Sequence, residues 1–131
     1  MRSYSRTLKP DGSIKVRDVY PFFVAGSVTA QPGAHRLYNV YGETLKILAV
    51  HASVGTAPQG SPIIIDVNIN GATIFTNQGN RPTIPAGGTS SGRVASMNVT
   101  DWPDGAYITV DVDQVGSSVP GSALTVLVVV G

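Results

Sequence analysis

The sequence contains no cysteine and few charged residues. Because cysteine is absent from all 131 residues, disulfides, thiolate metal ligands and cysteine nucleophiles are excluded. Charged residues make up 13% of the chain, well below the usual quarter, whereas hydrophobic residues make up 42%. A chain of this length forms one domain, which must be held together by packing or by association with other subunits.

Apolar runs of the lengths used for targeting or membrane spanning are also missing. The first twenty residues carry five Lys and Arg residues and no apolar core of a signal peptide. The apolar run 124–130 is far too short to cross a bilayer as a helix. We therefore expect no membrane partner.

The segment 63–76 shows the clearest structural pattern. Residues 63–69 alternate between an aliphatic side and a mixed side, which is the period of a half-buried strand. Asn70-Gly71 follows, and these two residues tolerate the positive φ angles of a type I′ turn. The pattern predicts a β-hairpin in which Ile69 faces Ala72. Its outer face is expected to carry Ile64, Asp66, Asn68, Thr73 and Phe75.

Turn residues separate several further stretches that read as strands, because the chain has 15 glycines and 9 prolines. The expected strands cover residues 20–24, 34–40, 44–54, 93–99, 106–115 and 124–130. Pro21 indicates an edge strand, and the slipped alternation of 44–54 predicts a bulge near Leu48. The pattern predicts an all-β, single-domain antiparallel β-sandwich of about eight strands, jelly-roll-like and without helices of consequence.

Residues 1–19 lack sustained periodicity and contain the turn sequence Pro10-Asp11-Gly12-Ser13. We expect an extended N-terminal arm here, attached to a β-sandwich domain of residues 20–131. The arm carries five basic and two acidic residues, a net charge of +3, whereas the remainder carries four basic and six acidic residues, a net charge of −2. This asymmetry predicts that the arm lies against an acidic neighbour, and a solvated flexible tail is the alternative.

Few residues have the spacing of a metal site. His35 and His51 have no second histidine or carboxylate at ligand spacing. Residues 66–71 fit the first half of an EF-hand calcium loop, but the twelfth position, which requires Glu, is Asn77. We therefore predict no metal site.

Asp111 and Asp113 are the best candidates for catalysis. They lie on one side of an expected strand with Cβ atoms about 7 Å apart, inside the range of a glycosidase carboxylate pair. Alternating aspartates also keep one strand face solvated, and we prefer that interpretation, so we expect no enzyme. The Gly-rich run 86–92 lacks a P-loop lysine and a following helix, and the body has no basic face. We predict neither a cofactor nor a nucleic-acid partner.

Four short motifs occur together in the body of the chain. They are SVGTAP (53–58), DVNINGATIF (66–75), NRPTI (80–84) and TVDVDQVGS (109–117). In this combination, residues 20–131 resemble a module that recurs in virion proteins of tailed bacteriophages. The resemblance implies a non-enzymatic β-sandwich present in many copies on the virion, on the capsid surface or the tail. The N-terminal arm lies outside it.

A fibre or spike subunit normally brings a stalk, such as a coiled coil or a collagen-like repeat, and none is visible in this sequence. We therefore expect a head decoration (cement) protein, which binds the outer capsid surface as an oligomer and stabilises it by contacting the major capsid protein. The alternative is a tail-tip or fibre-associated module that contacts other tail proteins and recognises a host surface glycan through loops such as 78–92.

The apolar strand 124–130 and the outer face of the hairpin predict exposed apolar surface that closed symmetry, in a homotrimer, would bury. The residues expected at the oligomer or capsid interface are Arg2, Arg6, Lys9, Lys15, Arg17, Ile64, Phe75, Leu127 and Val129.

Overall fold

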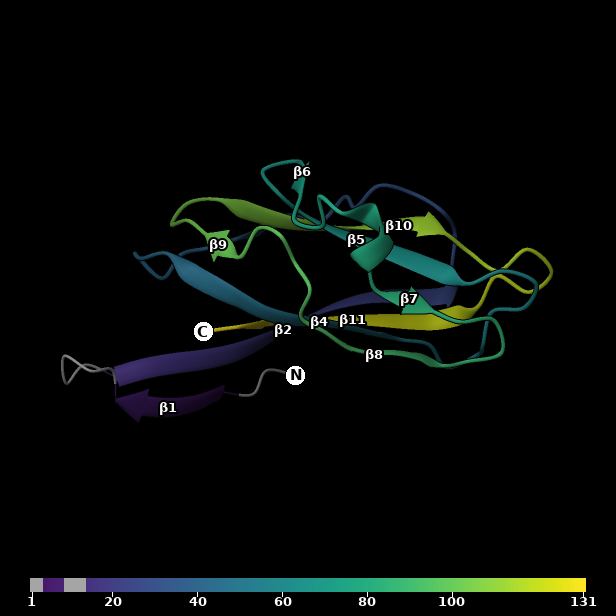
Figure 1. The fold of residues 1–131 in the computed structure, drawn as a ribbon, viewed down its shortest axis with the longest axis horizontal. Coiled ribbons are helices and arrows are strands. Elements are labelled where there is room, and N and C mark those ends of the chain that lie inside the picture. The colour runs from purple at the N-terminus through teal and green to yellow at the C-terminus, as the bar shows by residue number, and fades with distance from the viewer. Residues whose placement is uncertain (1–3, 9–13) are drawn as a thin grey trace.

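The computed structural model describes residues 4–8 and 14–131. Its strands form two antiparallel sheets stacked face to face (Figure 1), so the structure confirms an antiparallel β-sandwich. The chain passes between the sheets at most of its connections, and one continuous apolar core lies between them.

The first sheet contains, in order, β1 (Tyr4–Leu8), β2 (Ile14–Ser27), β11 (Ser122–Val130), β4 (Leu45–Ser53) and β8 (Ser90–Val94), with β9 (Asp101–Trp102) beside β4. The second sheet contains, in order, β3 (Leu37–Tyr38), β10 (Tyr107–Gln114), β5 (Ile63–Ile69) and β6 (Ala72–Thr73), with β7 (Thr83–Ile84) beside β5. A single 3₁₀ turn, η1 (Gln78–Asn80), interrupts the strands. The described residues form eleven strands instead of about eight, because four of these strands are only two residues long.

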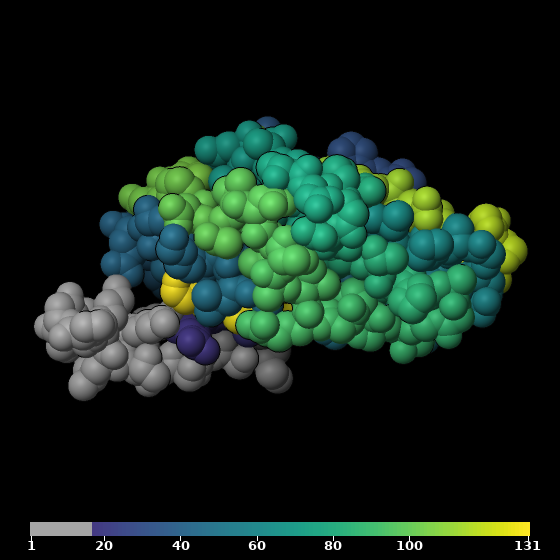
Figure 2. All heavy atoms as spheres, viewed as in Figure 1, coloured from purple at the N-terminus to yellow at the C-terminus, as the bar shows by residue number. Residues whose placement is uncertain are grey.

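β11 is the central strand of the first sheet, as its doubly apolar sequence predicts. It pairs with β2 on one side and with β4 on the other. Leu124, Val126 and Val128 face the second sheet and are buried, whereas Leu127 and Val129 face away from it and are half-buried. In the space-filling view, β11 is visible only as small patches between neighbouring segments (Figure 2).

The predicted hairpin forms between β5 and β6. Asn70 has a φ of 49° and Gly71 a φ of 83°, as a type I′ turn requires, and Ile69 lies opposite Ala72. The pairing continues only to Ile74, whose amide donates to the carbonyl of Val67. Beyond this point β5 pairs with β7 instead.

Phe75 was expected on the outer face of this hairpin, and that prediction was wrong. Its side chain is 0% exposed and belongs to the core. The Phe75 amide donates to the Thr73 side-chain oxygen at 3.0 Å, so the chain turns out of strand geometry before residue 75. The alternation of side chains ends with β6, and Phe75 packs inward. Ile64, from the same expected face, is half-buried.

The predicted bulge in β4 is confirmed. Val129 of β11 lies opposite Ala49, whereas the next residue, Val130, lies opposite Ile47. β4 therefore carries one additional residue, Leu48, at this point. Because of this extra residue, apolar side chains before the bulge and after it face the core.

β2 crosses the expected boundary between residues 19 and 20. Residues 14–18 pair with β1, and residues 18–27 pair with β11. The β1–β2 hairpin projects beyond the rest of the first sheet (Figure 1). Of the basic residues assigned to the arm, Arg2 and Lys9 lie outside the described residues, Arg6 and Lys15 are described only as strand positions, and Arg17 is exposed.

Replacing Phe75 with alanine should lower the free energy of unfolding by about 3–5 kcal/mol, because it leaves a cavity in the core. Val40→Ala is the control: Val40 is 85% exposed, and its truncation should change the free energy by no more than about 0.5 kcal/mol. Urea unfolding of dilute protein, followed by Trp102 fluorescence, measures both. Equal effects of the two substitutions would contradict the placement of Phe75.

Candidate interaction surface

A groove of about 710 Å³ opens along one side of the sandwich. One wall is formed by β2 and β11 through residues that include Phe22, Val24 and Val126. The opposite wall is formed by Val110 and Val112 of β10 and by the connection between β2 and β3. We call residues 31–36 of this connection the strap. The groove has the size of many small-molecule sites, and its lining is mostly apolar.

The strap is fixed to the edge of β10 by backbone and side-chain contacts. Gln31 and Val112 exchange two backbone hydrogen bonds of 2.9 Å. The Gly33 amide donates to the Asp111 carboxylate at 2.7 Å. A Cβ atom on Gly33 would lie 2.2 Å from the carbonyl oxygen of Val110, so only glycine allows this approach. These contacts hold the strap in place as one wall of the groove.

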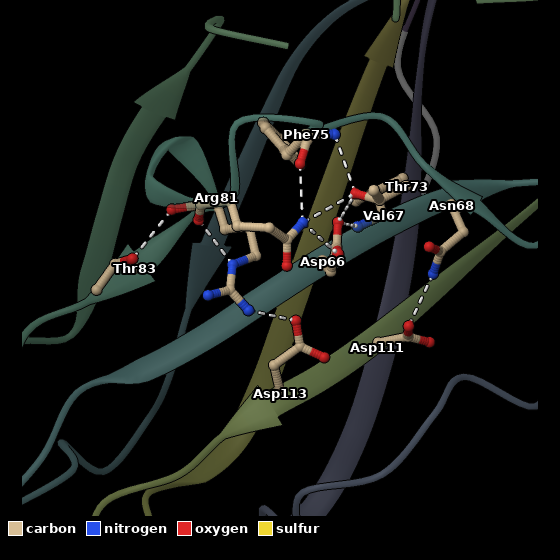
Figure 3. A network of polar contacts seen from close by, with 10 residues as sticks. Asp66, Val67, Asn68, Thr73, Phe75, Arg81, Thr83, Asp111 and Asp113 are labelled. Carbon is tan, nitrogen blue, oxygen red and sulfur yellow. Dashed lines mark hydrogen bonds and ion pairs between the residues drawn. The ribbon is translucent and has the colours of Figure 1, made fainter. Parts of the chain in front are cut away.

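Asp111 and Asp113 each have structural partners (Figure 3). Besides Gly33, the Asp111 carboxylate accepts a hydrogen bond of 2.8 Å from the Asn68 side chain. Asp113 forms an ion pair of 2.7 Å with Arg81. Asp111 is thus half-buried and hydrogen-bonded, and the expectation that both aspartates serve only to solvate the strand is wrong for this residue. The two carboxylates bind different parts of the chain to β10.

The outer face of β5 is covered by the segment that follows β6 (Figure 3). Asp66 is 6% exposed, and its carboxylate accepts hydrogen bonds from the Val67 amide and the Thr73 hydroxyl at 2.8 and 2.6 Å. The Gln78 side-chain amide reaches the same carboxylate at 3.2 Å and the Phe75 carbonyl at 2.8 Å. This network closes the face on which the sequence suggested a partner.

A second buried carboxylate lies at the base of the projecting hairpin. The Tyr20 hydroxyl donates to the Tyr41 hydroxyl at 2.6 Å, and Tyr41 donates to Asp18 at 2.7 Å. The ring of Tyr20 meets Trp102 edge to face, with centroids 5.9 Å apart. Burial of the Tyr20 side chain, followed by its hydrogen bond with Tyr41, raises the pKa of Tyr20 well above its usual range.

The two histidines lie apart. His35 is exposed on the strap and lines the groove, whereas His51 is half-buried in β4 with its Nε2 atom 3.0 Å from the Ser90 hydroxyl. Within residues 4–8 and 14–131, no group of three or more His, Asp or Glu side chains is placed to hold a metal ion. In the same part of the chain, no helix is long and apolar enough to cross a membrane.

Of the residues predicted at an interface, Leu127, Val129 and Arg17 reach the surface of the first sheet, and Ile64 does so on the second. They do not form one site. The groove beside β2 was not predicted, although one signal was present: no charged residue occurs from Val19 to Ala34.

Comparisons with known proteins do not identify relatives. No protein-family model matches the chain. No curated protein and no solved structure matches it either.

Replacing Asp111 with alanine should release the strap, because the Gly33 amide and the Asn68 side chain lose their acceptor. We expect the free energy of unfolding to fall by about 1.5–3 kcal/mol and the Gly33 amide to exchange faster with solvent. Asp113→Ala is the control, since its partly exposed ion pair contributes less than about 1 kcal/mol. Hydrogen exchange and urea unfolding test this, and unchanged Gly33 exchange in Asp111→Ala would refute the assigned role.

Stability should fall as the pH rises above about 10, the pKa of tyrosine in an unfolded chain. The folded protein retains the Tyr20 proton at a pH where the unfolded chain releases it, so the unfolded state is favoured progressively. Tyr20→Phe should make the free energy of unfolding fall less steeply with pH. Tyr38→Phe, a substitution in β3, should leave the fall unchanged. Urea unfolding between pH 8 and 11 gives the comparison. A decline as steep in Tyr20→Phe as in the unsubstituted protein would rule out Tyr20 as its source.

Proposed function

We propose that this protein is a non-enzymatic structural protein of a tailed bacteriophage virion, and that it decorates the head. In this role it binds the outer capsid surface as a homo-oligomer and stabilises the shell. The observation that carries the proposal is the apolar stretch on the outer side of β2 and β11, where Phe23 is 67% exposed and Leu127 and Val129 are half-buried, on a domain of few charges. Surfaces of this kind are usually covered by another protein.

The environment of the aspartates supports a structural role. Asp111 holds the strap, Asp113 pairs with Arg81, and Asp66 closes the outer face of β5. Asp111 and Asp113, the candidates for catalysis, and Asp66, from the partial EF-hand match, thus each have a partner that fixes part of the fold. The resemblance of the four sequence motifs to phage virion modules is consistent with such a role.

The projecting β1–β2 hairpin is the element best placed to reach a neighbouring protein. It extends beyond the rest of the first sheet (Figure 1), and residues 1–19 carry a net charge of +3. Its chemical complement is an acidic surface, on the major capsid protein or on an adjacent copy. A trimer remains our prediction for the assembly, with Leu127 and Val129 among the residues that it buries.

Immunogold labelling of virions from the phage that carries this gene tests the location. We expect gold over the head. Label confined to the tail would replace the proposal with the alternative, a tail-tip or fibre-associated receptor-binding module, and a glycan array should then show a saccharide preference. Virions without label would overturn both.

Attachment should depend on the charge of the N-terminal residues. We expect that replacing Arg2, Arg6, Lys9, Lys15 and Arg17 with glutamine weakens binding to capsids lacking the protein by at least tenfold at low salt, because these residues supply the positive charge. The matched control replaces Arg36 and Arg93, which are exposed on the body, with glutamine. A cosedimentation assay measures both variants, and equal binding would show that the hairpin charge plays no part.

A further inference from the structure

β2 has a strand edge that no described residue occupies. β1 pairs with residues 14–18 and stops there, and β11 occupies the other side of residues 18–27. Among residues 4–8 and 14–131, no strand therefore pairs with the β1-facing side of β2 beyond Asp18. The backbone groups on this side of residues 22–25 point away from the sheet.

Between Pro21 and a bulge at Gly26, this edge lacks the charges that commonly protect a strand from pairing with another chain. Exposed edges in natural proteins commonly carry lysines or other charges. Here Val19 to Ala34 contains no charged residue, and Phe23 is 67% exposed on the outer side of the strand. Pro21 removes one donor near the start of the edge, but the following residues, Phe22 to Ala25, are free of proline.

The groove lies directly inside the same edge. Phe22 and Val24 face the second sheet but remain half-buried, because the strap stands away from them across the groove. An apolar small molecule would cover these side chains and leave the backbone edge unpaired. An added β-strand covers the apolar side chains and also pairs the backbone edge, because its backbone bonds to the edge and its alternate side chains enter the groove.

We propose that a second copy of this chain supplies that strand, and that two β2 edges pair antiparallel about a twofold axis. An uncharged edge can pair with itself without repulsion, and an isologous contact satisfies both edges at once. Centred on Phe23, the pairing sets Phe23 opposite its own counterpart on the outer face. It also sets Phe22 opposite Val24 of the other copy on the groove side. The two grooves then meet and close over each other.

The inference rests on the self-association included in the proposed function, but not on where the protein lies in a virion. If copies also form trimers through another surface, the β2 contact joins two trimers to each other. In either case, breaking the contact should halve the mass of the assembly. Because the test uses purified full-length protein alone, its failure would leave the labelling of virions unaffected.

Phe23→Glu places two like charges opposite each other on the axis. We expect its mass, measured by light scattering during size-exclusion chromatography at about 0.1 mM, to be half that of the unsubstituted protein. Val40→Glu is the control, since Val40 is 85% exposed and lies outside β2, in the connection between β3 and β4. A monomeric unsubstituted protein, or a Phe23→Glu variant of unchanged mass, would overturn the proposal. Circular dichroism confirms that each variant retains its strands.

A cysteine substitution tests the register independently, because the chain has no other thiol. Opposed residues of antiparallel strands have Cβ atoms roughly 4.5–5.5 Å apart, close to the separation that a disulfide needs. We expect Phe23→Cys, after oxidation, to yield mostly a covalent dimer of twice the 13.6 kDa chain mass. Val40→Cys should yield little dimer. Equal cross-linking of the two variants would reject a contact centred on Phe23.

Discussion

Apolar contact between the two sheets is the interaction on which the rest of the structure depends. The chain has no disulfide to join the layers, and side chains such as Ile65 and Val67 of one sheet share a continuous core with Val126 and Val128 of the other. Full burial of each such side chain contributes about 1.5–3 kcal/mol. Where this packing stops, beside β2, the sandwich opens into the groove.

Buried polar side chains complete the fold where strand pairing is missing. Asn39 donates to the carbonyls of Glu43 and Trp102 and accepts from the Tyr41 amide, so one side chain holds a whole turn. Asp66 holds the segment after β6, and Asp18 accepts from Tyr41 at the base of the hairpin. A buried carboxylate or amide without such partners would be costly, which explains why each one is bound to a specific segment.

Short-range patterns predicted the fold well. The Asn70-Gly71 turn and the bulge at Leu48 each follow from a few neighbouring residues, and both are present. The prediction failed where distant segments decide the outcome. Residues 34–40 alternate like a strand, yet only Leu37–Tyr38 pairs, because the strap is drawn to Asp111 and Asn39 is buried in a turn.

The same limit applies to the candidate surface. The groove depends on how far β2 stands from β10, and no local pattern encodes that separation. Phe23 could be assigned to a strand from the sequence, but its exposure depends on the fact that no described strand lies beyond β2 at this position. The uncharged run from Val19 to Ala34 was the one signal available, and it indicates burial as readily as an interface.

The position of β11 has a consequence for biosynthesis. The ribosome makes β2 and β4 long before β11, although β11 lies between them in the finished sheet. Until it emerges, the nascent chain exposes two apolar strands that lack their common neighbour. Sheets built from such distant segments assemble slowly, and their unpaired strands are prone to aggregate. The first sheet can thus be completed only after β11 has emerged from the ribosome, and rapid overexpression should favour aggregation over correct folding.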